Sequence, residues 1–164
     1  MTDFRETIRA LEDEHRQSAA SQNGKPSFPV YTTAELKSIP PPEYLVDGFL
    51  VKGALNSLFG AFDSYKSFIA IDWTLTIAAG IGSWFGHEAN TGPVVYIAGE
   101  GGSGLWQRVE AWADHRQCEP PDVYWITSAV NMFRKSEAEA LLAWIGGLPV
   151  PPVLVCSTPS ADAL

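Results

Sequence analysis

The sequence predicts a three-layer α/β fold built on a mainly parallel sheet. From Tyr44 onward, strand-like and helix-like segments alternate, as expected when each helix carries the chain back to begin another parallel strand. Two glycine-bearing turns each follow a strand-like run and precede a helix-like run, which is where α/β folds place ligand-binding loops. The hydrophobic fraction of 46% in 164 residues suits one domain with its own core.

The individual elements follow from hydrophobic spacing and from helix start and stop signals. Glycines end two of the helices, and a serine is expected to cap the last one. In chain order we expect strands over 45–51 and 54–59, a helix over Lys66–Ala79 ended by Gly80, a strand over Val94–Ala98, a helix over 105–117, a strand over 123–127, a helix capped by Ser136 and ended after Ile145 by Gly146 and Gly147, and a strand over 153–156.

The first 43 residues differ in composition from the rest. Phe4, Ile8 and Leu11 recur at helical spacing among charges, which predicts a solvated amphipathic helix over 3–20. The stretch 23–42 is rich in proline, which is typical of a linker. We therefore predict an N-terminal helix and linker over 1–43 and a folded domain over 44–164.

Charge and cysteine content exclude several classes of protein. The formal net charge of -8 argues against this chain gripping a nucleic-acid backbone alone. Two cysteines give no disulfide framework, and the charged N-terminus lacks the apolar region of a signal peptide. The apolar run 68–85 contains Asp72, so a buried helix is expected there instead of a membrane span. The sequence predicts a cytoplasmic protein.

The segment 58–67, LFGAFDSYKS, has the placement of a phosphate-binding loop, or Walker A motif. At a helix N-terminus, backbone N–H groups and the helix dipole favour an anion, a lysine supplies charge for the outer phosphates, and a serine hydroxyl can ligate magnesium. The usual motif has glycine before the lysine, whereas Tyr65 stands there. The predicted nucleotide-binding residues are Gly60, Asp63, Ser64, Tyr65, Lys66 and Ser67, with Ser67 also the metal ligand. The alternative is a lysine at an ordinary exposed turn.

A second glycine-rich turn is a rival. Gly99, Gly101 and Gly104 satisfy the G-x-G-x-x-G pattern after one expected strand and before a helix, which is the setting of dinucleotide binding. Such a site needs an acidic residue at the end of the next strand, but that strand ends in Thr127 and Ser128. An ordinary glycine-rich turn is the third interpretation.

Taken in order, these segments resemble a known family. Leu45-Val46-Asp47-Gly48-Phe49-Leu50, the phosphate loop, Ser83-Trp84-Phe85-Gly86 and the run 93–102 are similar to the RepA-like branch of AAA-family P-loop ATPases with a RecA-type core, encoded by plasmids, phages and mobile elements. Residues 126–127, 141–145 and 153–155 continue the resemblance.

The resemblance implies ATP and Mg²⁺ as cofactors, with Lys66 and Glu100 as catalytic residues, Glu100 orienting the attacking water. It implies a replicative helicase that acts as a homo-oligomer, a hexamer in intact relatives, and that meets single-stranded DNA only through the ring.

The chain departs from the family pattern in two ways, and these lead to an alternative function. The family has an Asp after its fourth strand to hold magnesium through water, and Ser157 occupies that position here, with Asp162 the only later acid. The family's remaining strands lie beyond Leu164, so we predict a C-terminally truncated copy. A non-hydrolysing nucleotide-binding remnant or interaction module is therefore the alternative to an active ATPase.

Metal ligands and tryptophans complete the sequence-based predictions. His87 with Glu88, and His115 with Cys118, lack the further partners that a zinc site needs. Trp84 falls in an expected loop, where it is a candidate for an adenine or subunit contact. We expect the remaining tryptophans of predicted elements to serve in core or interface packing: Trp73, Trp106, Trp112, Trp125 and Trp144.

Overall fold

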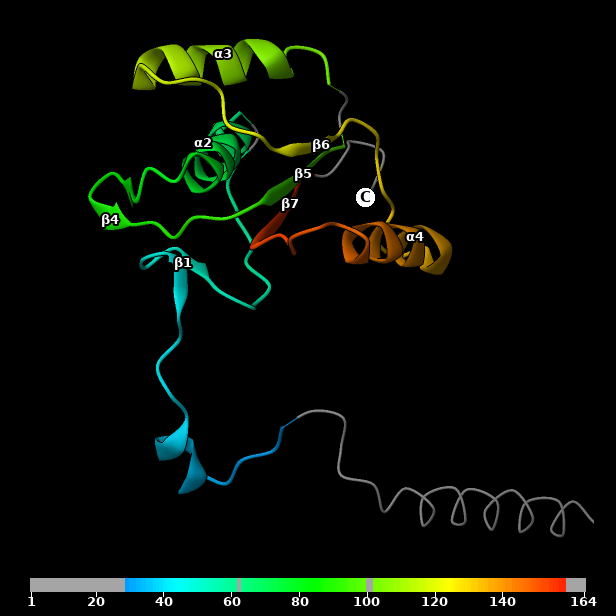
Figure 1. Cartoon of the computed structure of the whole chain (residues 1–164). Helices are drawn as coiled ribbons and strands as arrows, with labels where there is room; N and C mark the ends of the chain where they lie inside the picture. Colours follow the sequence, from blue (N-terminus) through cyan, green and yellow to red (C-terminus); the bar gives the residue numbers. More distant parts are fainter. Residues whose placement is uncertain (1–28, 62, 100–101, 159–164) are drawn as a thin grey trace, which may run out of the picture. The chain divides into compact units, whose positions relative to one another are not determined.

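The computed structural model describes residues 29–61, 63–99 and 102–158 (Figure 1). Backbone proximity divides the chain into two units, Met1–Pro41 and Pro42–Leu164. In the first unit, the described part carries one short 3-10 helix, η1 (Glu35–Ser38), within the expected linker. The Thr32 N–H and hydroxyl both donate to the Glu35 carboxylate at 2.7 Å, which fixes the start of that turn. The amphipathic helix predicted over 3–20 lies outside the described residues.

The second unit contains a parallel sheet with strand order β6-β5-β7. The central strand is β5 (Val94–Ala98), which pairs with β6 (Tyr124–Ile126) on one side and with β7 (Leu154–Thr158) on the other. All five residues of β5 are buried, as expected for a strand covered on both faces. The α/β class and the parallel sheet are therefore confirmed.

Helices cover both faces of this sheet (Figure 1). On one face, α2 (Lys66–Ala79) and α3 (Leu105–Arg116) pack against Tyr96 and Ala98. On the other face, α4 (Lys135–Gly146) packs its Leu141 against Val95 and Ile97. Alternate residues of β5 thus point to opposite layers, which gives the three-layer core that was predicted and that a RecA-like P-loop domain requires.

Two small antiparallel hairpins stand beside this core. The first joins β1 (Tyr44–Val46) to β2 (Leu50–Val51), and the second joins β3 (Ser83–Trp84) to β4 (His87–Glu88). A bridge between Val46 and Ala89 links the hairpins, and they share a core with Trp73 and Ile77 of α2.

Local sequence signals predicted most elements, but two strands were wrong. The stretch 45–51 is not one strand, because Gly48 at φ +73° turns the chain back into a hairpin. The stretch 54–59 forms no strand: Gly53 turns at φ +68°, and the Asn56 side chain bonds the N–H and carbonyl of Val51, which keeps the chain in a local turn.

The start of α4 also corrects a prediction. The helix begins at Lys135 after Arg134, and the expected Ser136 cap is absent. Instead, the Glu137 carboxylate accepts a 2.8 Å hydrogen bond from the Asn131 N–H, so the first turn is tied to the preceding loop.

Gly80 at φ +66° ends α2 as predicted, because glycine adopts the left-handed conformation without strain.

Candidate functional site

The predicted phosphate loop lies immediately before α2. Of the segment 58–67, residues 58–61 and 63–67 are described, and α2 begins at Lys66, as the sequence predicted. Because α2 packs against β5 and β7, the loop is anchored to the central strand of the sheet through its helix.

The Lys66 side chain folds back over its own loop. Its ammonium Nζ donates to the carbonyls of Gly60 at 3.1 Å and Ala61 at 2.6 Å, and lies 3.3 Å from the Ser64 hydroxyl. These contacts join the entry of the loop to the first residue of α2. The lysine therefore closes the loop into a ring and fixes a positive charge inside it.

Gly60 and Ser64 form a close contact within this ring. The Ser64 hydroxyl donates to the Ala61 carbonyl at 2.7 Å, and the Ser64 N–H donates to the same carbonyl at 3.3 Å. A Cβ at Gly60 would lie 2.6 Å from the Ser64 oxygen, which is closer than atoms can approach. A side chain at position 60 would therefore force the Ser64 hydroxyl to move away from the Ala61 carbonyl.

The loop contains two strained backbone positions. Asp63 and Tyr65 both have φ of 58°, in the left-handed region. Aspartate tolerates this conformation, but it is unfavourable for a bulky residue such as tyrosine. Tyr65 thus adopts the geometry that the glycine of the usual motif supplies. Strain of this kind persists where surrounding structure imposes it and is concentrated at functional sites.

The start of α2 presents N–H donors. The Phe68 and Ile69 N–H groups bond the Tyr65 carbonyl, whereas the N–H groups of Lys66 and Ser67 have no backbone acceptor among the described residues. The positive end of the helix dipole lies at the same place. Ser67 is half-buried and carries a hydroxyl at the second position of the helix. Amides, one ammonium and one hydroxyl together suit a polyphosphate and a hard metal ion.

The second glycine-rich turn follows β5 and begins α3. The Gly99 N–H donates to the Thr158 carbonyl at 3.1 Å, which ties the ends of β5 and β7 together, and Gly104 at φ +77° precedes α3. Glu100 and Gly101 lie outside the described residues, so the role of Glu100 stays a prediction. The dinucleotide interpretation gains no support, because β6 ends at Ile126 with no acidic residue following it before Ser128.

Ser157 lies within β7, opposite Ile97 of β5. The strand continues to Thr158, two residues beyond the predicted end, and the Thr158 hydroxyl donates to the Ile97 carbonyl at 3.3 Å. The carboxyl end of β7 therefore carries two hydroxyls where the family pattern has a carboxylate. Asp162 lies outside the described residues.

Buried groups behind this end of the sheet are held neutral. Burial raises the pKa of the Cys156 thiol to about 11. Burial also raises the pKa of Tyr96 to about 12. Both side chains belong to the cluster that packs α2 on the sheet, so their chemistry is that of core residues.

Sequence reasoning overlooked Arg108 and Phe68 near the loop. The Arg108 guanidinium of α3 lies 4.7 Å from the centre of the Phe68 ring, and the Tyr65 ring meets Phe68 edge-on at 5.8 Å. This stack joins the first turn of α2 to α3. Arg108 and Phe68 are 40 residues apart, so no local pattern predicts that they meet. The only available signal was that Arg108 follows the second glycine-rich turn closely.

The structure bears on three of the tryptophan predictions. Trp84 lies in β3, where it is buried and its indole donates to Asp72 at 2.7 Å, so it is not available for an adenine or subunit contact. Trp106 is 59% exposed and Trp144 is 42% exposed, so the core alternative is wrong for both, and interface packing stays a prediction for them. Trp144 faces the sheet across an open groove, where its ring meets that of Tyr124 edge-on at 5.8 Å between centres.

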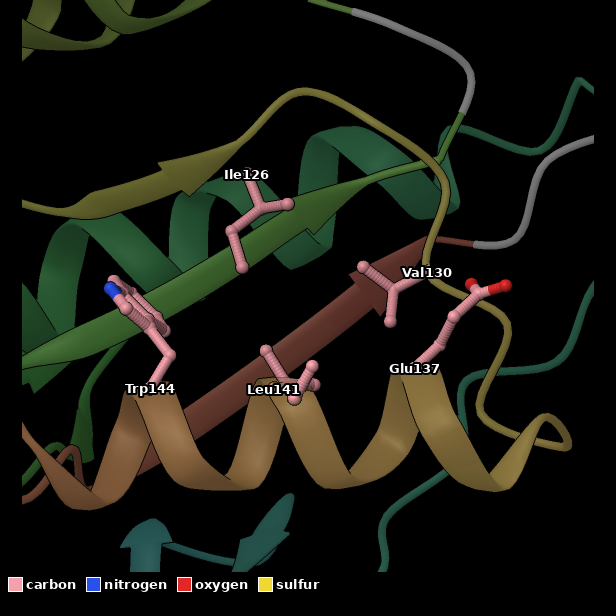
Figure 2. Close-up of a pocket in the computed structure, with 6 residues that line it drawn as sticks. Ile126, Val130, Glu137, Leu141 and Trp144 are labelled. Carbon is pink, nitrogen blue, oxygen red and sulfur yellow. The ribbon is translucent and has the colours of Figure 1, made fainter.

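An open apolar groove lies on the opposite face of the sheet (Figure 2). It has a volume of about 280 Å³ and runs between α4 and the strands, whereas α2 and the phosphate loop belong to the other layer. The groove is therefore separate from the predicted nucleotide site. Its lining residues are Ile126, Val130, Glu137, Ala140, Leu141 and Trp144.

Two negative results concern the described part of the chain. No three histidine, cysteine, aspartate or glutamate side chains gather there as a metal site. Over the same residues, no helix combines the length and apolarity that a bilayer crossing demands.

Comparison with known proteins gave one match. A family model described as an AAA domain matches residues 25–155, which is most of the chain and includes the phosphate loop, β5 and the first strand residues of β7. No curated protein and no solved structure matches the sequence.

Proposed function

The chain belongs to the AAA domain family of P-loop ATPases, and on this premise we propose that it binds ATP with Mg²⁺ at loop 60–67. The observation that carries the proposal is the Lys66 ammonium, which bridges the Gly60 and Ala61 carbonyls at the start of α2. The lysine thus binds two loop carbonyls, and the N–H groups of Lys66 and Ser67 remain for an anion.

Each loop residue has a separate role in the proposal. Lys66 holds positive charge beside the outer phosphates, and Ser67 offers its hydroxyl to the metal. Asp63 and Tyr65 contribute backbone N–H groups, Ser64 would contribute its own on leaving the Ala61 carbonyl, and Gly60 allows the close turn. Bound ATP would supply the phosphoanhydride bond, with the metal neutralising its charge.

Glu100 is the proposed base that orients the attacking water. Support comes from its position in sequence, two residues after the end of the central strand β5, because ligands of open α/β sheets bind beyond the carboxyl ends of the strands. The hydrogen bond from the Gly99 N–H to the Thr158 carbonyl joins the carboxyl ends of β5 and β7. This supports placing the nucleotide site at that edge of the sheet.

The finer part of the proposal is a RepA-like replicative helicase of a mobile element, coupling hydrolysis to DNA unwinding or translocation. The net charge of -8 supports contact with single-stranded DNA only within a homo-oligomeric ring, such as a hexamer, because a lone acidic subunit repels phosphates.

Steady-state ATP turnover tests the enzymatic proposal. We expect wild-type protein with Mg²⁺ to release phosphate, and we expect Lys66→Ala to lose that turnover. Lys52→Ala is the matched control, since Lys52 forms an exposed pair with Glu43 at 3.0 Å away from the loop. Equal turnover in wild type and Lys66→Ala would reject the assignment.

A non-hydrolysing nucleotide-binding module is the second candidate. Ser157 favours it, because a neutral hydroxyl on β7 replaces the carboxylate that the family uses to anchor magnesium. In this case Mg-ATP binds and depends on Lys66, but wild-type turnover stays at background. Ser157→Asp is then expected to raise turnover without changing the need for Lys66.

A further inference from the structure

Most positive charges of the second unit are paired with carboxylates. Of the lysines and arginines described there, four form ion pairs: Lys52, Arg116, Arg134 and Lys135. The other two are Lys66 and Arg108, and neither has a carboxylate partner among the residues that the structure describes. In a chain of net charge -8, these two side chains are the cations left to meet an anion.

Arg108 lies against the first turn of α2. Its guanidinium carbon is 4.7 Å from the centre of the Phe68 ring, and that ring meets the ring of Tyr65, a residue of the phosphate loop, at 5.8 Å. Phe68 follows Lys66 by two residues in the same helix. A single aromatic ring therefore separates the Arg108 charge from the loop, and both cations without a carboxylate partner lie at the same end of α2.

The charge of Arg108 also acts on the central strand. Burial raises the pKa of Tyr96 in β5 to about 12, and the positive charge of Arg108 opposes this rise, because a nearby cation favours the phenolate. Tyr96 lies on the face of β5 that α2 and α3 cover. Arg108 is thus close to both the first turn of α2 and the strand beyond whose carboxyl end a ligand of an α/β sheet binds.

The contact that Arg108 makes in this structure is one that an anion can replace. Arg108 is exposed, and the Phe68 ring beneath its guanidinium is 51% exposed. A guanidinium gains little from stacking on an exposed ring, whereas its hydrogen bonds to phosphate oxygens are charge-assisted and can be bidentate. A polyphosphate at the loop therefore competes successfully with the ring for the guanidinium.

We propose that Arg108 is a second cationic ligand of the polyphosphate, which leaves the Phe68 ring to pair with phosphate oxygens when Mg-ATP binds. The inference rests on the proposed function, because it adds a residue to the same site. Lys66 supplies positive charge from the loop, and Arg108 supplies it from α3. Bound nucleotide thus connects α2 to α3.

The test is calorimetric titration of the full chain with Mg-ATP and, separately, with inorganic triphosphate. The key variant is Arg108→Met, whose long apolar side chain still packs on Phe68 but carries no charge. We expect it to bind both probes about tenfold more weakly than the wild type does. Arg108→Lys keeps a positive charge that can bind phosphate, so its affinity should lie between those of the wild type and Arg108→Met.

Lys37→Met is the matched control. Lys37 is an exposed cation of the first unit, and it too forms no ion pair with a described carboxylate. This variant changes the net charge as Arg108→Met does, but it should bind as the wild type does. Added salt should weaken wild-type binding more steeply than binding by Arg108→Met, because salt screens a charge that only the wild type has.

Three outcomes count against the proposal. If the wild type binds both probes and Arg108→Met binds them equally well, this inference is wrong and the proposed function still rests on Lys66. If Arg108→Lys binds no better than Arg108→Met, Arg108 acts through its shape and not through its charge, and the inference is again wrong. If folded wild-type protein binds no Mg-ATP, the proposed function and this inference are both wrong.

Discussion

The carboxylate of Asp72 and the indole of Trp112 are joined by a 2.6 Å hydrogen bond that fastens α2 to α3. The other carboxylate oxygen of Asp72 accepts from the Trp84 indole at 2.7 Å, and Arg116 lies 3.6 Å away on α3. One acidic side chain thus connects the helix of the phosphate loop to the second helix and to a hairpin. Because the carboxylate is only partly exposed and accepts from two donors, it stabilises this corner of the fold.

Asp72→Asn is therefore expected to destabilise the protein by about 1–3 kcal/mol. The amide oxygen of asparagine can accept from one indole, of Trp84 or Trp112, but its NH₂ group cannot accept from the other. The Arg116 guanidinium also loses its negatively charged partner. Urea denaturation measures the change. Asp114→Asn on exposed α3 surface is the control, and an equal loss in both variants would show that Asp72 has no special role.

Glycine usually makes a protein less stable than alanine does at the same position, and the conformation of Tyr65 predicts the opposite order there. Both Tyr65→Gly and Tyr65→Ala remove the ring, so their difference reports the backbone alone. At φ of 58° the glycine variant should be more stable than the alanine variant by about 1 kcal/mol. At Glu110, inside α3 and exposed, the order should reverse. Thermal denaturation of the four variants checks this.

Gly60 and Ser64 should behave as a coupled pair. A methyl group at Gly60 would force the Ser64 hydroxyl away from the Ala61 carbonyl, at a cost of about 1 kcal/mol. Gly60→Ala in a Ser64→Ala background should cost much less, because the hydroxyl is gone. A double-mutant cycle from denaturation curves measures the coupling, and simple additivity would contradict the loop geometry.

The buried thiol of Cys156 predicts a loss of stability in alkali. Its pKa is raised from 9.0 to about 11, so the unfolded chain releases this proton before the folded one does. The free energy of unfolding should therefore fall between about pH 9 and 11, by up to about 1.4 kcal/mol per pH unit. Tyr96 extends the fall toward pH 12. Cys156→Ala should flatten the first part of this profile, whereas exchange of the exposed Cys118 should not.

Elements with strong local signals were predictable from the sequence. The helix Lys66–Ala79 and the strand Val94–Ala98 have the predicted bounds. Both are apolar runs whose ends are marked in the sequence, since each is followed directly by a glycine. The stretch 54–59 failed because a strand needs a pairing partner, which an apolar run does not reveal. The loop position was also predictable.

Contacts between distant segments were not predictable. Asp72 served in the sequence only as a reason against a membrane span, yet it binds Trp112, 40 residues further along the chain. The Arg108 contact with Phe68 and the pairing of the two hairpin tips have the same origin. Such pairs depend on how helices and hairpins pack, and no periodicity within either segment encodes them.

Calorimetric titration of Mg-ATP into wild-type protein and Lys66→Ala tests the central claim most directly. The account predicts one saturable site in the wild type and affinity lower by at least about tenfold in the variant, with urea denaturation showing that the variant is still folded. Folded wild-type protein that gives no binding, or equal affinity in Lys66→Ala, would contradict a phosphate-binding role for the loop at the start of α2.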